Sequence, residues 1–193
     1  DRLRLEGVGR RRPREGPRLD PHRLLKALVP HRVLHEEVGG GDLASAPGEA
    51  LRNGCIDLLV QVDDAGGPDP HLELAAPGMG VDIEGPFGRF ALPPIRRGSS
   101  LLLVAGGTGI APLRSMLIDA LDHATPPRIG VVYSARSVDE LAYRGELDDL
   151  AAAGRITLRL TVTREENAAW PGRRGRIDQH LLAEALPSRR AAC

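Results

Sequence analysis

The stretch LLLVAGGTGIAP, residues 101–112, decides the fold. Its apolar first half predicts a buried strand over residues 101–105, and the glycines that follow predict a tight loop. Glycines directly after a buried strand let an anionic ligand come close to the backbone. Pro112 suits the first turn of a helix, because its missing N–H would be unpaired there anyway. The stretch therefore predicts a strand, an anion-binding loop and a helix in succession.

Beyond this stretch, apolar helices and strands alternate toward the end of the chain. Leu113, Met116 and Leu117 begin a helical apolar repeat, Ser137 is a candidate N-cap, and Gly154 is a candidate helix end. The predicted elements are helices over residues 111–122, 138–152 and 177–186 and strands over residues 129–133 and 156–162. This βαβαβα order predicts a parallel, doubly wound half-sheet.

The strand patterns also predict the strand order. The strand at 101–105 is apolar throughout, as a central strand is, whereas the strand at 156–162 alternates, as an edge strand can. We therefore expect the order 3-2-1. The chain supplies no further strand beside the first one, so we expect a C-terminally incomplete sheet, or a partner chain that completes its unpaired edge.

The N-terminal half has a different pattern. Residues 43–97 carry short apolar runs between Gly/Pro turns, such as CIDLLVQV at 55–62, which predict an antiparallel sheet or part of a β-barrel. Residues 1–42 are rich in Arg, Pro and Gly and are expected to be irregular or disordered, apart from a weak helix around Leu24, Leu25 and Leu28. The expected domains are residues 1–42, 43–97 and 98–193.

Composition excludes several classes of protein. Lys plus Arg and Asp plus Glu each number 26, so the net charge of zero favours neither nucleic acid nor a membrane surface as a partner. Cys55 and Cys193 form no CxxC pair, and the six His residues lack metal-ligand spacing, so no metal site is expected. No apolar run is long enough to span a membrane and no secretory signal is recognisable, so we expect a cytoplasmic protein.

Candidate binding residues begin in the glycine loop. Gly106, Gly107 and Gly109 allow close approach of a phosphate, and the Thr108 hydroxyl can donate a hydrogen bond to it. The loop is no Walker motif, and Pro112 replaces the third glycine of a strict GxGxxG. A glycine-rich connector without a ligand is the alternative.

Arg and hydroxyl residues follow the next two predicted strands. Ser134 and Arg136 come after one, Thr163 and Arg164 after the other, and Arg176 lies in the GRRGR run just beyond. Ligands of open α/β sheets lie outside the carboxyl ends of the strands, where an Arg cluster suits the 2′-phosphate of NADP. Solvated surface charge is the alternative for these Arg residues. Trp170 is a candidate for adenine stacking, but covering the loop edge is the commoner role.

The segments GPFGRF, LLLVAGGTGIAPLRSM, VVYSARSVDELAYRGEL, TVTRE and GRRGRI together resemble the ferredoxin–NADP⁺ reductase superfamily, over roughly residues 43–193. The resemblance implies a partial antiparallel β-barrel that binds FAD, followed by a NADP-binding domain. Hydride would pass between NADPH (or NADH) and FAD, and electrons would reach a one-electron carrier such as a ferredoxin, or an oxygenase component. No protein nucleophile is needed.

The resemblance also assigns residues to the cofactors. The pyrophosphate and nicotinamide side would contact Gly106, Gly107, Thr108, Gly109, Ala111 and Pro112. Selection of NADP would fall to Ser134, Arg136, Thr163, Arg164 and Arg176.

The flavin motif matches only in part. Within LASAP, residues 43–47, Ser45 corresponds to the flavin-binding run, but Gly39, Gly40, Gly41 and Asp42 stand where the family has Arg-x-Tyr-Ser. The alternative is therefore a catalytically silent NADP-binding module that has lost flavin binding.

Overall fold

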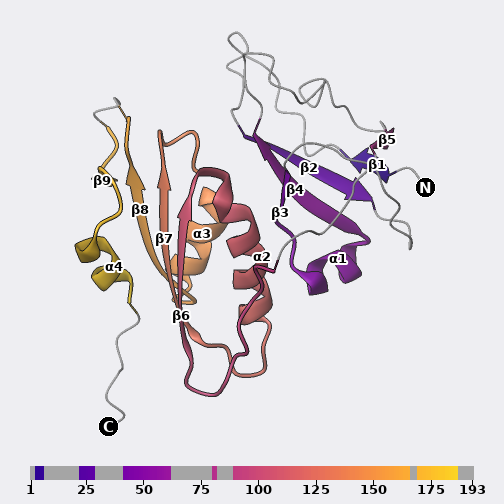
Figure 1. Ribbon diagram of the computed structural model, residues 1–193, viewed down its shortest axis with the longest axis horizontal. Helices are drawn as coiled ribbons and strands as arrows, with labels where there is room; N and C mark the ends of the chain where they lie inside the picture. Colours follow the sequence, from indigo (N-terminus) through magenta and orange to yellow (C-terminus); the bar gives the residue numbers. More distant parts are fainter. Residues whose placement is uncertain are drawn as a thin grey trace. The chain divides into compact units, whose positions relative to one another are not determined.

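The computed structural model describes residues 3–6, 22–28, 41–61, 80–81, 89–165 and 169–186. The chain divides into two compact units, unit 1 at residues 1–90 and unit 2 at residues 91–193. Figure 1 shows the secondary structure of each unit.

Unit 1 contains a five-stranded antiparallel sheet in the order β3-β4-β2-β1-β5. Its strands are β1 (Leu3–Glu6), β2 (His22–Leu28), β3 (Gly41–Leu43), β4 (Cys55–Gln61) and β5 (Gly80–Val81). The antiparallel sheet expected in this half is confirmed, and β4 coincides with the predicted strand at 55–62. The GPFG segment, residues 85–88, lies outside the described residues.

The helix expected around Leu24 and Leu28 is wrong, because β2 occupies that segment. β2 pairs with β4 along its whole length, from His22 opposite Gln61 to Leu28 opposite Cys55. A continuous ladder with a strand more than 25 residues away outweighs a weak local helical repeat. β1 also lies inside residues 1–42, which we expected to be irregular.

Helix α1 (Pro47–Asn53) was not expected from the sequence. The Glu49 carboxylate accepts a hydrogen bond from Ala46 N at 2.9 Å, and Gly54 ends the helix with φ +66°. These are the ordinary start and stop features of a helix, but α1 is too short to show an apolar repeat.

Unit 2 contains a four-stranded parallel sheet in the order β6-β7-β8-β9. Its strands are β6 (Ser100–Gly106), β7 (Arg128–Ala135), β8 (Thr157–Val162) and β9 (Arg173–Arg174). The predicted α/β fold and the 3-2-1 order are confirmed, with the short β9 added outside β8. Within the described residues β6 is bonded on one side only, by β7, and Val104 on it is 45% exposed. A partner strand on its free side stays a prediction.

Three helices cover the two faces of this sheet: α2 (Ile110–Leu121) and α3 (Arg144–Ala152) on one face and α4 (Gln179–Ala185) on the other (Figure 1). The apolar face predicted for α2 is confirmed by the burial of Leu113, Met116, Leu117, Ala120 and Leu121. On the other face, Leu181 and Ala185 pack with Val132 of β7.

Helix α3 begins six residues later than predicted, at Arg144 instead of residue 138, and Ser137 does not cap it. Tyr133 fixes the loop before α3 in a non-helical conformation. Its hydroxyl donates to Glu140 O at 3.3 Å and accepts from Ala142 N at 3.2 Å. These bonds use backbone groups that a longer helix would need for itself. Gly154, with φ +69°, follows the helix as predicted.

In the part of the chain that the structure describes, no helix is both long enough and apolar enough to cross a bilayer.

Candidate functional site

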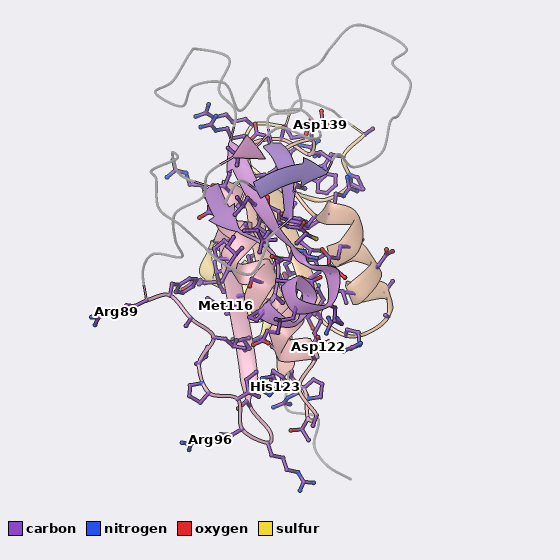
Figure 2. The ribbon with its side chains drawn as sticks, turned by 90° about the vertical axis from the view of Figure 1, so that its right-hand side faces the viewer. Arg89, Arg96, Met116, Asp122, His123 and Asp139 are labelled. Carbon is purple, nitrogen blue, oxygen red and sulfur yellow. The ribbon has the colours of Figure 1, made fainter. Side chains whose placement is uncertain are left out.

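The register of the parallel sheet aligns the ends of its strands. Gly106 pairs with Ser134, Ser134 with Thr161, and Thr161 with Arg173, so these residues form one row across β6, β7, β8 and β9. We call this row and the residues that directly follow each strand the carboxyl edge. In Figure 2, Asp139 marks this end of unit 2, and Asp122 and His123 mark the opposite end of α2.

All the residues predicted for NADP lie at or beside the carboxyl edge. Gly106 ends β6, Ser134 lies one residue before the end of β7, and Thr163 and Arg164 directly follow β8. With strands about 4.8 Å apart, the ends of β6 and β9 are separated by roughly 14 Å. The predicted set is Gly106, Gly107, Thr108, Gly109, Ala111, Pro112, Ser134, Arg136, Thr163, Arg164 and Arg176.

The glycine loop has an open surface. Gly107–Gly109 form a single 3₁₀ turn between β6 and α2, and Gly107 has φ +55°, which favours glycine. Among the described residues, a Cβ added at Gly106, Gly107 or Gly109 would meet no atom within 4 Å. Packing among the described residues therefore does not explain the glycines at 106 and 109, and the backbone of the loop is suited to close approach of a ligand. Ala111 is fully buried and anchors the start of α2.

The N-terminus of α2 is suited to an anion. Among the α-helices in the described ranges, α2 alone has neither a side-chain cap nor an acidic residue in its first turn. By contrast, the Asp178 carboxylate caps α4 by accepting from Leu181 N at 2.9 Å, and this hydrogen bond lowers the pKa of Asp178. At its cap and in its first turn, α2 thus offers no negatively charged side chain to its first N–H groups or to its positive dipole end. A phosphate group fits this position.

Two predicted cation sites lie side by side at the carboxyl edge. Arg164 N donates to Arg136 O at 2.7 Å, and Thr163 N donates to Ala135 O at 3.0 Å, so the segments after β7 and β8 run together. The side chains of Arg136, Arg164 and Arg176 are exposed. Across the described residues, no carboxylate forms an ion pair with any of the three. Their charges are available to an anionic ligand.

The neighbouring Arg173 and Arg174 have structural partners instead. Arg173 forms an ion pair with Asp178, and Arg174 Nη1 donates to Trp170 O at 3.2 Å. Trp170 is 9% exposed, and the Arg144 guanidinium lies 5.0 Å from its ring centroid. The tryptophan thus packs against Arg144 at the start of α3, and both of its expected roles stay predictions.

Three residues with structural roles in this region are not among those predicted from the sequence. Arg114 on α2 is 7% exposed and binds Glu146 of α3 through two hydrogen bonds, of 2.6 and 2.8 Å. Tyr133 is fully buried, and burial raises its pKa to about 12. Glu165 accepts a hydrogen bond from Val138 N at 2.7 Å. An Arg beside the apolar face of α2 is a signal for a buried ion pair, but nothing in the sequence spacing links Glu165 to Val138.

Ser45 belongs to unit 1. It is 4% exposed, and its Oγ accepts a hydrogen bond from Asp57 N at 3.1 Å, which ties the start of α1 to β4. Its assignment to a flavin phosphate stays a prediction. Among the described residues, no group of three or more His, Cys, Asp or Glu side chains is placed to hold a metal ion.

Related sequences share this region. The profile of the oxidoreductase NAD-binding domain family matches residues 103–192. Ferredoxin–NADP reductase B of Sorangium cellulosum (strain So ce56) is 35% identical over 140 residues, which cover 72% of this chain and 55% of that protein. Sulfhydrogenase 1 subunit gamma of Pyrococcus furiosus is 33% identical over 136 residues, which cover 68% of this chain and 45% of that protein. The chain thus spans about half the length of these curated relatives.

Solved structures share the fold. The CS-b5R domains of human Ncb5or, in the NAD⁺ form, match with a TM-score of 0.74 at 19% identity, over 100% of this chain and 59% of that one. A ferredoxin NADP⁺ reductase from Neisseria gonorrhoeae with bound FAD and NADP matches with a TM-score of 0.60 at 16% identity, over 86% of this chain and 71% of that one. The matched NAD-binding domain, the related sequences and the shared fold agree with the motifs of the sequence, and the chain belongs to the ferredoxin–NADP⁺ reductase superfamily.

Proposed function

We propose that the carboxyl edge of unit 2 binds NADPH, and that the protein serves hydride transfer between NADPH (or NADH) and FAD. The observation that carries this proposal is that the N-terminus of α2 has no side-chain cap. It directly follows the open glycine loop and lies at the same sheet edge as Arg136 and Arg164. A one-electron carrier or an oxygenase component is the proposed acceptor of the electrons.

Each part of the edge has a distinct task in this proposal. The loop from Gly106 to Pro112 holds the pyrophosphate, because its backbone is exposed and leads into the positive end of the α2 dipole. Arg136, Arg164 and Arg176 bind the 2′-phosphate, for which guanidinium groups offer paired N–H donors. Ser134 and Thr163 add hydroxyl groups beside them.

The proposed division of labour follows the expected domains, with residues 43–97 contributing to FAD binding and residues 98–193 binding NAD(P). When bound, FAD supplies the chemistry that joins two-electron transfer from NADPH to one-electron acceptors. The protein's own contribution is to bind and orient the nucleotide.

A second candidate is a NADP-binding module without flavin. It is favoured by the glycines at 39–41, where the family has Arg-x-Tyr-Ser, and by Ser45, whose hydroxyl is buried and already bonded to Asp57 N. The carboxyl edge of unit 2 would then bind NADP in the same way, but no electrons would pass.

A visible spectrum separates the two candidates. The purified protein is incubated with excess FAD, desalted and scanned, and then mixed with NADPH or NADH without oxygen. A retained flavin band that bleaches with NADPH supports the reductase. A colourless protein that still binds NADP⁺ in calorimetry supports the second candidate, and a protein that binds neither contradicts both.

A further inference from the structure

The segment between β7 and α3, residues 136–143, presents Arg136 at the carboxyl edge, and we call it the Arg136 loop. Tyr133 holds the far part of this loop at Glu140 and Ala142. The near part, where Arg136 lies, is held by the segment after β8. Arg164 N donates to Arg136 O at 2.7 Å, and Val138 N donates to Glu165 Oε2, also at 2.7 Å.

These two bonds clamp the main chain on both sides of residue 137. The Arg164 bond is a backbone contact that most residue types could make at that position. The Glu165 bond depends on one side chain, which reaches 27 positions back along the sequence. A hydrogen bond from N–H to a carboxylate is stronger than one to a neutral oxygen. Glu165 is thus the specific element of the clamp.

Glu165 carries a negative charge although it lies next to residues that are proposed to bind a phosphate. A carboxylate beside residues that bind a phosphate opposes binding by Coulomb repulsion. Its half-buried position and its bond to Val138 N turn it toward the protein backbone. Its hydrogen-bonding role and its charge therefore have opposite expected effects on phosphate binding, which makes them separable by mutation.

We propose that Glu165 is a positioning residue for recognition of the 2′-phosphate: by holding Val138 N–H it fixes the main chain that presents Arg136 beside Arg164. This inference rests on the proposed function, in which Arg136 and Arg164 bind the 2′-phosphate of NADPH. Glu165 itself does not contact the nucleotide in this proposal.

The test uses the full chain and two probes that differ by one phosphate, adenosine 2′,5′-bisphosphate and adenosine 5′-monophosphate. Calorimetry gives the Kd of each probe without reading flavin activity. Glu165→Ala should weaken bisphosphate binding about fivefold, the equivalent of one hydrogen bond, and change monophosphate binding less than about twofold. Glu165→Gln keeps an oxygen acceptor for Val138 N and loses the charge, so it should bind the bisphosphate as tightly as the wild type or more tightly.

Asp139→Ala is the matched control, because it removes an exposed carboxylate from the same loop (Figure 2). It should leave both Kd values within about twofold. Should Glu165→Ala fail to fold in a thermal melt, Glu165→Asp takes its place, since its side chain is one methylene shorter, which should weaken the bond to Val138 N, and it keeps the charge.

Two results overturn the proposal: equal discrimination between the probes in wild type and Glu165→Ala, or Glu165→Gln losing as much as Glu165→Ala. A wild type that does not prefer the bisphosphate contradicts instead the 2′-phosphate site of the proposed function.

Discussion

Arg136 and Arg164 place two permanent positive charges on adjacent segments that share a backbone hydrogen bond. Both side chains are exposed, so their charges are hydrated until a ligand arrives. A guanidinium gains most from a phosphate when it forms paired hydrogen bonds, which a diffuse surface charge does not provide. A specific site and a solvated surface therefore differ in how strongly they prefer NADPH, which has a 2′-phosphate, over NADH, which has none.

Arg164→Ala should raise the Kd of NADPH about tenfold to a hundredfold, because a charged hydrogen bond contributes about 1.5–3 kcal/mol. The Kd of NADH should change less than about twofold, since NADH has no 2′-phosphate. Arg96→Ala is the control, because Arg96 precedes the opposite end of β6 (Figure 2). Equal losses for both nucleotides in calorimetry would reject the 2′-phosphate assignment.

Tyr133 acts through one hydroxyl group that both donates to and accepts from the Arg136 loop. Burial favours the neutral phenol over the phenolate, and the pKa of Tyr133 rises from about 10 to about 12. Its stabilising effect is thus complete below pH 10 and is lost as the pH rises from 10 toward 12.

Tyr133→Phe should lower the free energy of unfolding near neutral pH by about 0.5–1.5 kcal/mol, because it removes both hydroxyl hydrogen bonds while Ala142 N still donates to Glu140 O at 3.0 Å. Above pH 10 the wild type should lose stability faster than the variant, so the difference between them should narrow. Urea unfolding at a series of pH values measures both effects. Parallel curves from pH 8 to pH 12 would show that Tyr133 does not titrate as its burial implies.

At the scale of elements, the Arg114–Glu146 ion pair joins the helix of the glycine loop to the helix that follows the Arg136 loop. Its two hydrogen bonds are 2.6 and 2.8 Å long, and the Arg114 guanidinium also lies 5.1 Å from the centroid of the Tyr143 ring. Tyr143 precedes α3 with φ +58°, an unusual conformation for a bulky residue. The ion pair thus fixes α3 where its start is otherwise strained.

Glu146→Ala should destabilise the protein by about 2–4 kcal/mol, because it leaves the buried Arg114 charge without its carboxylate. The matched control is Asp148→Ala, which removes the exposed ion pair between Arg144 and Asp148 on the same helix. That change should cost less than about 1 kcal/mol. Urea unfolding followed by circular dichroism compares them, and similar losses in both variants would argue that burial of Arg114 adds nothing.

At the scale of the whole molecule, the chain consists of two compact units with different sheets. Unit 2 has its own core, built on both faces of the parallel sheet, and it carries every residue predicted to bind NADP. A domain with its own core is expected to fold alone.

A fragment of residues 91–193 should therefore unfold cooperatively and bind NADP⁺ with a Kd within about threefold of the full chain. Thermal unfolding followed by circular dichroism and calorimetry with NADP⁺ are the measurements. A fragment that folds but does not bind would show that unit 1 contributes to the nucleotide site.

Much of unit 2 was predictable because its elements are set by local rules. The apolar repeat of α2 and the continuous apolar run of β6 indicated the fold and the position of the glycine loop between them. In unit 1, the helical repeat at Leu24 and Leu28 was misleading, because pairing with β4 decides that segment.

The sequence by itself determined the α/β order of unit 2 and the place of its glycine loop, because periodicity, glycine and proline act over a few residues. Only the tertiary structure decided where α3 begins, which side chain holds Val138 N, and why Gly130 is a glycine: a Cβ there would lie 2.1 Å from Ala185 O. The last two depend on partners far along the chain, and the start of α3 depends on Tyr133 of the preceding strand β7. Such residues come into contact only when the sheet and its helices pack, and no local pattern in the sequence specifies these contacts.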